Sequence, residues 1–324
     1  MLDTNQMVKF VVPSDNPPQI QNSPHLARLK SHGELTIHRS TPSSIADQIE
    51  RVREAQIILN SQVSTKWSRS ELEQLPNLRL ISTCSVGTDM IDLEAARDLD
   101  IIVSNQADRV SPHVAEHIVA LLLTLAKKTA HHTKEMKAGR WHPQENVFLR
   151  GKVLGIIGAG NIGREVAKLG NAMGMNVISW TFNPTNERAK SLGVEFVELD
   201  QLLMAADAVT IQVRLSDSSK HILGARELGL MKKGALLVNA GRGELIDSDA
   251  LVGSLNSNHL GGAGLDVFEK EPLQPDHPIL SCKNVVLTPH VADYTPEGIE
   301  SLNEGCVDNI ISFLEGFPCN VVNP

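Results

Sequence analysis

The fold is indicated by the stretch Val153-Leu-Gly-Ile-Ile157, which is followed by Gly158-Ala-Gly160-Asn-Ile-Gly163 and a helical segment from Arg164 to Met173. A lone G-x-G-x-x-G pattern is a weak signal, but between an apolar strand and a helix it is typical of a dinucleotide-binding turn. The first glycine permits the tight turn, the second lets the backbone approach a pyrophosphate, and the third allows close helix–strand packing. The first N–H groups of the helix then face the phosphates. The residues predicted to bind a dinucleotide here are Gly158, Gly160, Asn161, Ile162 and Gly163.

Apolar strand candidates alternate with helical segments on both sides of this turn. The series that contains it has six strand candidates, at residues 152–157, 176–180, 208–213, 235–239, 262–267 and 285–287. An earlier series has four, at residues 8–12, 56–59, 78–82 and 101–104, with amphipathic helices at 44–55 and 68–75. Strands that alternate with helices favour parallel sheets covered on both faces. Six strands with interposed helices match the size of a dinucleotide-binding domain.

A long helical pattern from Ser111 to Arg140 separates the two series, and Pro112 suits its first turn. We therefore predict an α/β protein with two doubly wound parallel-sheet domains, the first ending near residue 105 and the second covering residues 106–292. One more helix, from about Pro296 to Glu315, closes the chain. The pattern alone does not decide to which domain this helix belongs.

Composition excludes several classes of protein. The chain has 324 residues, of which 41% are hydrophobic and 21% charged, as in globular domains with sizeable cores. A net charge of −8 argues against nucleic acid as the main partner. No apolar run reaches the roughly 18 residues that span a bilayer, and the N-terminus lacks a secretory pattern. The cysteines show no zinc spacing and are expected to be reduced thiols in a cytoplasmic protein without a metal site. They are Cys84, Cys282, Cys306 and Cys319.

Three later segments place polar residues at predicted strand ends, where open α/β sheets bind ligands. Arg242 stands between glycines in Asn239-Ala-Gly-Arg-Gly243, and its planar guanidinium suits capture of a carboxylate; a salt-bridged surface arginine is the alternative. His290 follows the last strand, and histidine is the usual acid–base group near neutral pH. Asp266 and Glu271 follow the strand before it, although a single acidic residue is most often solvated. Five other histidines are expected at helix or loop surfaces: His113, His117, His131, His132 and His142.

The adenosine end of the cofactor site lacks its usual acid. A carboxylate after the second strand normally holds the ribose 2′-hydroxyl of NAD. That position falls at Thr181, which can donate to a phosphate or accept from a hydroxyl. Arg188 and Lys190 are near in sequence, but most such residues are solvated surface groups. The choice between NAD and NADP therefore stays open.

With these residues in place, the sequence resembles the D-isomer-specific 2-hydroxyacid dehydrogenase family over nearly its whole length. The motifs that carry the resemblance occur in the family's order. They are Ser85-Val-Gly-Thr-Asp-Met-Ile-Asp92, Val114-Ala-Glu-His117, the glycine turn at 158–163, Asn239-Ala-Gly-Arg-Gly243, Gly264-Leu-Asp-Val-Phe268, Glu271-Pro272 and Thr288-Pro-His290.

The resemblance implies a Rossmann-type cofactor domain, residues 106–292, inserted into a flavodoxin-like substrate domain, residues 1–105 plus 293–324. It implies catalytic roles for Arg242, Glu271 and His290, and an NAD or NADP cofactor that also contacts Ala240 and Asp266. Hydride would pass between C2 of a small D-2-hydroxy or 2-oxo acid, such as glyoxylate or hydroxypyruvate, and the nicotinamide. Backbone N–H groups near Val86 and Gly87 would hold the substrate carboxylate. Members of the family are usually homodimers, joined mainly through their cofactor domains.

The chain also departs from the family pattern. Arg214 stands where members often have proline and could face the adenosine. Thr83 stands where members acting on phosphoglycerate tend to carry arginine, and the sequence ends at Pro324 without an added regulatory domain. Both features disfavour a phosphoglycerate dehydrogenase. Two alternatives stay open: a dinucleotide-sensing protein like the family's transcriptional corepressors, and a formate or phosphite dehydrogenase on the same scaffold.

Overall fold

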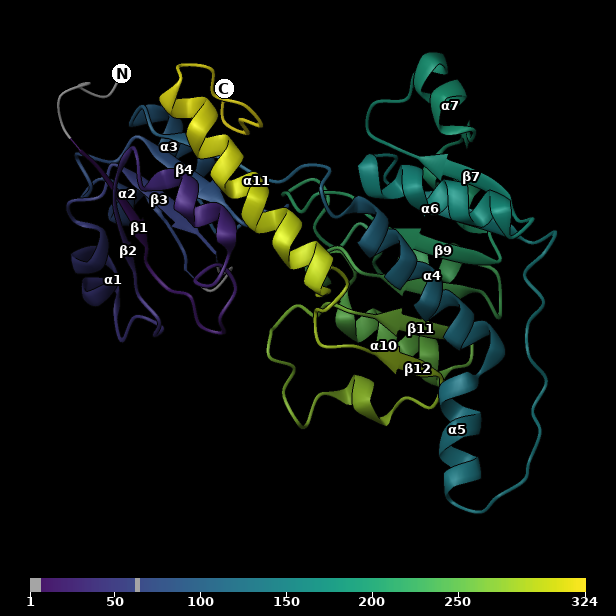
Figure 1. Ribbon diagram of the computed structural model, residues 1–324. Helices are drawn as coiled ribbons and strands as arrows, with labels where there is room; N and C mark the ends of the chain where they lie inside the picture. The colour runs from purple at the N-terminus through teal and green to yellow at the C-terminus, as the bar shows by residue number, and fades with distance from the viewer. Residues whose placement is uncertain (1–6, 62–64) are drawn as a thin grey trace. The chain divides into compact units, whose positions relative to one another are not determined.

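The computed structural model describes residues 7–61 and 65–324, and the chain divides into two compact units (Figure 1). Unit 1 contains the described residues up to Val110 together with Tyr294–Pro324. Unit 2 is the continuous segment Ser111–Asp293. Each unit has a parallel sheet of its own, so both sequence series form sheets and the predicted α/β fold class is confirmed.

In its described residues, unit 1 has a five-stranded parallel sheet in the order β2-β1-β3-β4-β5. The strands are β1 (Val8–Val12), β2 (Gly33–Ile37), β3 (Ile57–Asn60), β4 (Leu80–Thr83) and β5 (Ile102–Ser104). Strand β2 was not among the predicted strands. It lies at the edge of the sheet, where its residues are half-buried or exposed, and so it lacks the continuous apolar run of a central strand.

The helices of unit 1 begin at recognisable caps. They are α1 (Ile45–Val52), α2 (Arg69–Leu72), α3 (Leu93–Asp98), α11 (Pro296–Leu314) and the short 3₁₀ helix η1 (Pro24–Leu29). The Thr295 side chain accepts from the Gly298 N–H at the start of α11. Helix α11 packs against β4, where the Ser82 hydroxyl donates to the Cys306 carbonyl oxygen at 3.0 Å. The C-terminal helix thus belongs to unit 1, a point that its sequence pattern left undecided.

Unit 2, all of whose residues are described, has a seven-stranded parallel sheet in the order β12-β11-β10-β9-β6-β7-β8. The strands are β6 (Val153–Ile157), β7 (Asn176–Trp180), β8 (Glu195–Phe196), β9 (Ala208–Ile211), β10 (Leu236–Asn239), β11 (Gly262–Leu265) and β12 (Val285–Leu287). The expected number of six strands was wrong, because β8 has only two residues and no apolar run. Strand order reverses between β6 and β9, and ligands bind beyond the strand ends at such a point.

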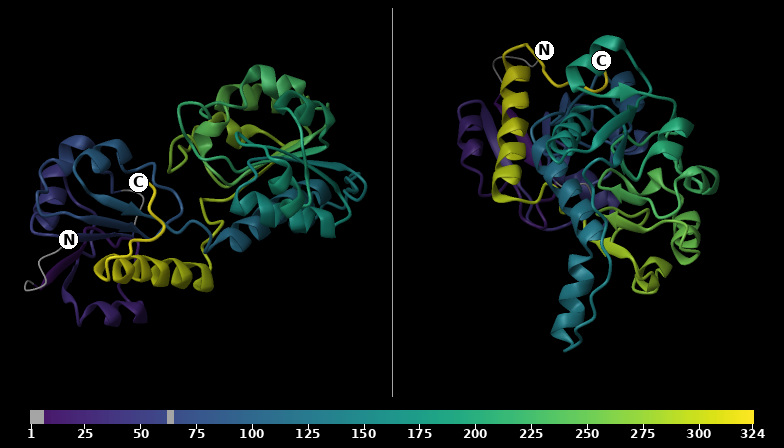
Figure 2. Two further views of the ribbon diagram at one scale, coloured as in Figure 1. Left: turned by 90° about the horizontal axis from the view of Figure 1, so that it is seen from above. Right: turned by 90° about the vertical axis from the view of Figure 1, so that its right-hand side faces the viewer.

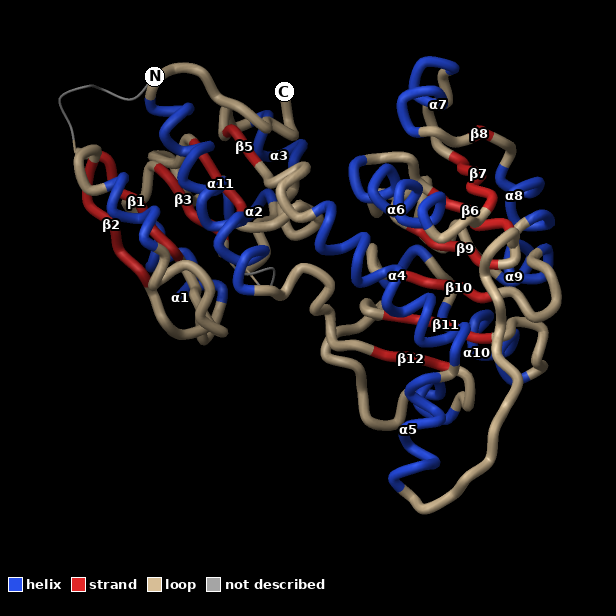
Figure 3. The backbone as a smooth tube through the Cα atoms, turned by 45° about the vertical axis from the view of Figure 1, so that its right-hand side comes forward, coloured by secondary structure: helices blue, strands red, loops and turns tan. Residues whose placement is uncertain are grey.

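Helices cover both faces of this sheet (Figure 3). Helices α4 (Ser111–Lys127) and α6 (Asn161–Ala172) pack together on one face. The other face carries α8 (Leu199–Ala205), α9 (Ala225–Leu230) and α10 (Ser248–Asn256), with two short 3₁₀ helices at Gly243–Leu245 and Pro278–Ser281. Helix α7 (Asn186–Leu192) follows β7. A large apolar core, with Leu202, Leu237 and Ile211 fully buried, fixes the strand ends relative to one another.

The predicted helix from Ser111 to Arg140 is interrupted. Lys128 has a left-handed backbone, with φ at +51°, and separates α4 from α5 (Thr129–Lys137). Helix α5 has no buried residue and extends away from the rest of unit 2, as the right-hand view of Figure 2 shows. The difference arises because the apolar face that stabilises a helix ends with Leu125 and Ala126, and the next residues are polar.

The sequence predicts neither a membrane-spanning segment nor a metal site. Among the described residues, no helix has the length and apolar character needed to cross a membrane. The same residues contain no group of three or more His, Cys, Asp or Glu side chains that could hold a metal ion. The cysteines are free thiols; Cys84, Cys282 and Cys306 are buried, and Cys319 is half-buried. Their small size and burial fit the structural role expected of them.

Candidate active site

The glycine turn at residues 158–163 joins β6 to α6, and two of its glycines are required by close contacts. Gly158 has φ at +109°, and a Cβ there would lie 2.8 Å from the Gln212 and Val213 backbone. A Cβ on Gly163 would overlap the Gly158 carbonyl oxygen. Gly160 differs, because a Cβ there would meet nothing within 4 Å. The backbone at Gly160 is therefore open to a ligand.

This turn fits the pyrophosphate of a dinucleotide. Gly160 is the N-cap of α6 and supplies no side chain to the first N–H groups of the helix. Those groups have no acceptor within a helix and attract anions. Next to the turn, the Gln212 side-chain nitrogen is buried and has no hydrogen-bond partner among the described residues. A phosphate or ribose can be bound by an uncovered glycine backbone, by the N-terminus of a helix and by an amide without a partner. This turn has all three, and its helix is twelve residues long.

The other predicted cofactor contacts stand at the same edge of the sheet. Thr181 directly follows β7, and the Trp180 carbonyl oxygen accepts a hydrogen bond from the Gly158 N–H at 2.8 Å. Thr181 is thereby placed close to the glycine turn. Ala240 follows β10 and Asp266 follows β11. Because parallel strands end at one edge, these residues lie along the line that an extended dinucleotide would occupy.

Arg242 is carried by a short loop after β10 that is held by Asn239. The Asn239 side chain donates to the Arg242 carbonyl oxygen at 2.8 Å and accepts from the Gly241 N–H at 2.9 Å. The buried asparagine thus fixes the backbone on both sides of the arginine. Gly243 follows, and a Cβ there would overlap the backbone of Phe268 and Glu269. The Arg242 loop therefore packs directly on the loop that carries Glu271.

His290 and Glu271 form a hydrogen-bonded pair in unit 2. His290 Nδ1 lies 2.7 Å from Glu271 Oε2, and the two side chains are 35% and 34% exposed. The Phe268 N–H donates to the other carboxylate oxygen of Glu271 at 2.9 Å. Since Nδ1 is engaged by the acid, Nε2 is the nitrogen with which the ring can exchange a proton with a ligand. The backbone N–H holds the glutamate, the glutamate orients the histidine ring, and the ring is left able to act as an acid or base. This is the arrangement of a proton-transfer site.

The charges around this pair act on both pKa values. The hydrogen bond that His290 donates to the Glu271 carboxylate raises the pKa of His290 above its ordinary value, against the opposing effects of burial and of the Arg242 charge. Burial by itself raises the pKa of Glu271, but the bonds from His290 and the Phe268 N–H and the Arg242 charge outweigh it, so its pKa is lowered. The charge of Arg242 acts on both partners, which places the three predicted catalytic residues in one electrostatic neighbourhood.

Asp266 is fully buried and holds the loop that carries His290. Its carboxylate accepts from the Thr288 hydroxyl at 2.6 Å and from the N–H groups of Val291 and Ala292, each at 2.9 Å. Burial raises its pKa, yet the bonds that it accepts outweigh this effect and lower the pKa overall. The His290 N–H donates to the Asp266 carbonyl oxygen at 2.7 Å, and His290 has φ at +54°, a left-handed conformation uncommon outside glycine. The Asp266 contacts keep the backbone in that conformation.

His117, expected at a helix surface, instead joins this network. It lies on α4 and its Nε2 is 3.0 Å from the Thr288 hydroxyl and 3.4 Å from Asp266 Oδ1. Its side chain is only 20% exposed, so the surface assignment was wrong. Periodicity alone does not show that α4 packs against β11 and β12, and without that contact a helix histidine is expected in solvent. Its place in the Val114–His117 motif was the signal that could have found it.

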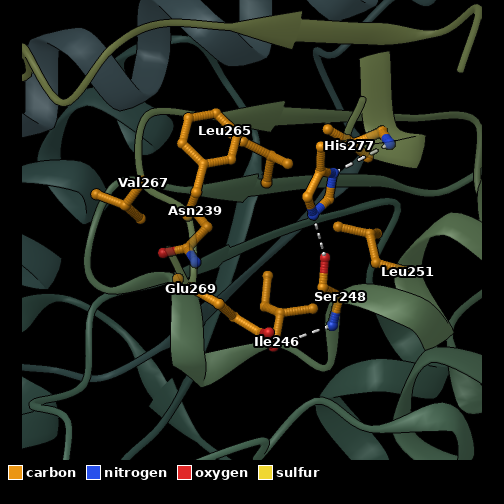
Figure 4. Close-up of a pocket in the computed structure, with 11 residues that line it drawn as sticks. Asn239, Ile246, Ser248, Leu251, Leu265, Val267, Glu269 and His277 are labelled. Carbon is orange, nitrogen blue, oxygen red and sulfur yellow. Dashed lines mark hydrogen bonds between the residues drawn. The ribbon is translucent and has the colours of Figure 1, made fainter. Parts of the chain in front are cut away.

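A small pocket under the loop of residues 267–269 contains a second pairing of polar groups (Figure 4). His277 Nδ1 accepts from the Ile279 N–H at 3.2 Å, so Nε2 carries the proton and donates to the Ser248 hydroxyl, 3.3 Å away. The Ser248 N–H donates to Glu269. With Nδ1 occupied and Nε2 protonated, His277 cannot take the serine proton as a catalytic base. These groups tie the loop to α10 and do not form a serine–histidine nucleophile.

The predicted carboxylate-binding residues lie in unit 1, in the turn after β4. The Val86 carbonyl oxygen accepts from the Asn105 side chain at 2.6 Å, and the Gly87 carbonyl oxygen accepts from the Ser85 hydroxyl at 2.9 Å. Both residues are half-buried. Neither of their N–H groups donates to another residue in the described part of the chain. Backbone N–H groups without an acceptor in the protein can bind an anion, as predicted for these two residues.

The glycine turn at the sheet's switch point and the histidine–glutamate pair at the same edge define a dinucleotide-dependent oxidoreductase. Comparison with known proteins makes the class more specific. Residues 119–292 match the model of the D-isomer specific 2-hydroxyacid dehydrogenase, NAD binding domain. The glyoxylate reductase of Aeropyrum pernix is 40% identical over 262 residues, which are 78% of each chain.

Solved structures agree with these matches. A glyoxylate reductase from Paecilomyes thermophila has a TM-score of 0.89 and 29% identity, covering 97% of this chain and 98% of its own. The NADPH-dependent glyoxylate/hydroxypyruvate reductase of Sinorhizobium meliloti, in complex with NADP and malonate, has a TM-score of 0.86 and 27% identity, covering 98% and 97%. The chain belongs to the D-isomer-specific 2-hydroxyacid dehydrogenase family. It is an oxidoreductase that uses NAD or NADP to interconvert 2-hydroxy and 2-oxo acids, and the family resemblance of its sequence is confirmed.

Proposed function

We propose that the protein reduces small 2-oxo acids of the glyoxylate and hydroxypyruvate kind to D-2-hydroxy acids, with His290, Glu271 and Arg242 as its catalytic residues. The observation that carries this proposal is the 2.7 Å contact between His290 Nδ1 and Glu271 Oε2, with the Arg242 charge acting on both groups. The substrate range is supported by the glyoxylate reductases among its relatives.

Proton transfer is the task of His290. The Glu271 carboxylate raises the pKa of His290 and so favours the protonated ring, whose Nε2 can give a proton to the carbonyl oxygen of the substrate as negative charge develops there. Glu271 holds the ring through Nδ1 and stabilises its charged form, as the acid does in a catalytic triad. In the oxidation direction the neutral ring accepts the hydroxyl proton of the 2-hydroxy acid.

Arg242 orients the substrate. Its guanidinium can bind the carboxylate and the neighbouring carbonyl oxygen together, which fixes the position of C2 and draws electron density from the carbonyl. Because Asn239 and Gly243 fix the backbone on either side, the side chain starts from a defined position. Because the arginine is ordered before the substrate binds, the entropic cost of ordering it does not add to the activation free energy.

The cofactor would be held by the glycine turn, Thr181, Ala240 and Asp266. Gly160 and the N-terminus of α6 would contact the pyrophosphate, and Thr181 would stand beside the adenosine ribose. When bound, the reduced nicotinamide supplies the hydride that C2 receives. The proposed boundaries remain those inferred from the sequence, with residues 106–292 as the cofactor domain and residues 1–105 plus 293–324 as the substrate domain. Val86 and Gly87 in the latter would bind the substrate carboxylate.

Association into a homodimer and a cytoplasmic location are further parts of the proposal. The segment from α5 onward leaves Met136, Trp141 and Phe148 largely exposed, with Trp141 at 78%. Large apolar side chains exposed on one projecting segment are typical of an interface with another chain. Free cysteines fit a reducing compartment. Analytical ultracentrifugation of the purified protein measures the oligomeric state directly.

A substrate panel tests the proposed activity. Glyoxylate, hydroxypyruvate, pyruvate and bulkier 2-oxo acids are assayed with NADH and with NADPH, and formate and phosphite are assayed in the oxidation direction. We expect turnover with the smallest 2-oxo acids and none with formate or phosphite. A protein that binds dinucleotide but turns over no member of the panel would instead be a sensor of the corepressor type.

A further inference from the structure

Helix α4 packs closely on strand β11 because that strand has glycines where the helix crosses it. A Cβ on Gly264 would lie 3.1 Å from the Leu121 side chain, and a Cβ on Gly262 would lie 3.2 Å from Leu125. One turn of helix and two residues of strand each advance about 6 Å, so helix and strand stay in step. His117 precedes Leu121 by one turn on the same face of α4. The next turn of the helix thus brings His117 to the end of the strand.

The hydrogen-bond geometry at that point shows which group donates to which. Thr288 Oγ1 and Asp266 Oδ1 are 2.6 Å apart, and two oxygens this close need a proton between them. Burial raises the pKa of Asp266, but the hydrogen bonds that it accepts lower it overall, so the ionised carboxylate has no proton to give. The single hydroxyl proton of Thr288 is therefore used on Asp266. The Thr288 oxygen is left to accept from His117 Nε2, 3.0 Å away, so this nitrogen carries a proton.

This chain of donors ends on the carboxylate that holds the proposed catalytic loop. Thr288 lies two residues before His290, and Asp266 also accepts from the N–H groups of Val291 and Ala292, just after it. The loop is thus held on both sides of a residue whose φ is +54°. A left-handed backbone is costly outside glycine and persists where surrounding contacts fix it. The position of the His290 ring therefore depends on how firmly Asp266 is held.

We propose that His117 is a positioning residue for the reaction: by donating to Thr288 it fixes the Asp266 carboxylate and, through it, the backbone that presents the His290 ring to the substrate. This inference rests on the proposed role of His290 in proton transfer. The Nε2 proton of His117 is engaged by Thr288, so His117 acts through its neighbours and not on a reacting atom. Its contribution is a fixed N–H donor, which another side chain of similar reach can supply.

Substitutions that remove or keep the donor test this role. His117→Leu removes the N–H group, so kcat for the reduction of glyoxylate should fall by roughly tenfold or more, while KM for the cofactor changes little. His117→Gln supplies an amide N–H of similar reach and should keep kcat within about threefold of the wild type. Leu125→Val is the matched control, because it alters packing on the same face of α4 and leaves the donor in place. It should lower the midpoint of thermal unfolding and leave kcat nearly unchanged.

A double-mutant cycle tests the route through Thr288. Thr288→Val removes the hydroxyl and should lower kcat about as much as His117→Leu does. Because both changes break one chain of hydrogen bonds, the double variant should be no slower than the slower single variant. Losses that multiply in the double variant would overturn the proposed route.

Hydrogen exchange of the ligand-free protein gives a readout that does not depend on turnover. The N–H groups of Val291 and Ala292 should exchange faster in His117→Leu than in the wild type, and at the wild-type rate in Leu125→Val. Unchanged exchange, or a loss of kcat that His117→Gln shares in full, would overturn the proposal. If His117→Leu does not fold, Thr288→Val takes its place in both measurements, and wild-type values in that variant would overturn the proposal.

The proposed function is tested separately by His290→Asn. Wild-type turnover in His290→Asn would overturn the proposed role of His290, and with it the basis of this inference. A large loss in His290→Asn together with wild-type turnover in His117→Leu would overturn only the role of His117.

Discussion

The two ends of the ligand-binding edge of unit 2 are built very differently. Around β11 and β12, the buried Asp266 carboxylate accepts three hydrogen bonds, and His290 is held by its own N–H as well as by Glu271. Around β7, the groups that would face the ribose are the half-buried Thr181 and Arg188, whose guanidinium is held by two carbonyl groups. The first end is held by many hydrogen bonds, whereas the second has only a few.

The difference matches the tasks of the two ends. Proton transfer requires heavy atoms to be placed within a few tenths of an ångström, which only a rigid network provides. Recognition of one phosphate requires a positive charge and a few donors near a solvent-facing rim, and tolerates more freedom. Changes at the catalytic end should therefore cost large factors in rate, while changes at the adenosine end should alter a preference and leave the reaction intact.

The largest effect is expected at His290. His290→Asn removes the acid–base group and should lower kcat by about 10²–10⁴-fold, because general acid–base catalysis contributes a factor of that order. Cofactor affinity should change little, since the glycine turn is untouched. Steady-state kinetics and titration with dinucleotide measure the two quantities separately. Turnover near that of the wild type at neutral pH would exclude His290 from the mechanism.

A smaller but still large loss is expected at Arg242. Arg242→Lys keeps the positive charge and loses the fork that binds two oxygens, so kcat/KM should fall by roughly a hundredfold. Both KM and kcat should be affected, because the arginine is proposed to contact carboxylate and carbonyl together. Kinetic constants within about a factor of two of the wild type would show that the contact is not bidentate.

Glu271 should determine the pH range of the reaction. Reduction needs protonated His290, so its rate falls as pH rises through the histidine pKa, which Glu271 raises. Glu271→Gln removes the charge that raises it. The fall in the reduction rate should then begin at lower pH, and the maximal rate should drop by roughly tenfold or more as ring orientation is lost. A pH profile of kcat/KM for reduction with an unmoved alkaline limb would contradict the assigned pairing.

The smallest effect concerns the adenosine end. Thr181→Asp introduces a carboxylate that repels a 2′-phosphate and accepts from ribose hydroxyls. The ratio of kcat/KM for NADH to that for NADPH should rise by roughly tenfold or more, with turnover preserved. The shift should be larger at low ionic strength, because salt screens charges at an exposed rim. An unchanged ratio would mean that Thr181 does not stand beside the ribose.

Much of this architecture is predictable from the sequence because local signals and tertiary structure agree. Gly158 has the positive φ of a tight turn, and Gly163 lies against the Gly158 carbonyl oxygen, so the glycine pattern between a strand and a helix is enough to predict the position of the turn. The proposed roles of Arg242, Glu271 and His290 came from family motifs, and the structure brings these residues into one neighbourhood. Their contact could be anticipated because consecutive parallel strands end at a common edge.

Other features depend on contacts that no local pattern records. His117 looked like any helix histidine, and its role in holding Thr288 and Asp266 follows only from the packing of α4 against β12. Arg188 looked like a solvated residue because the carbonyl groups that hold it lie five and 29 residues away in sequence. Strand β8 is formed by pairing with β7 and not by its own composition.

Gly243 limits how the substrate range of this enzyme could be altered by directed evolution. The backbone of Phe268 and Glu269 occupies the space that any side chain at this position would need. A mutant library randomised at residue 243 should consequently return only glycine among active clones. Because of the same contact, a loop graft from another family member should include residues 239–243 and 266–271 together. If only one segment were exchanged, it would pack against a loop of the original protein that does not fit it.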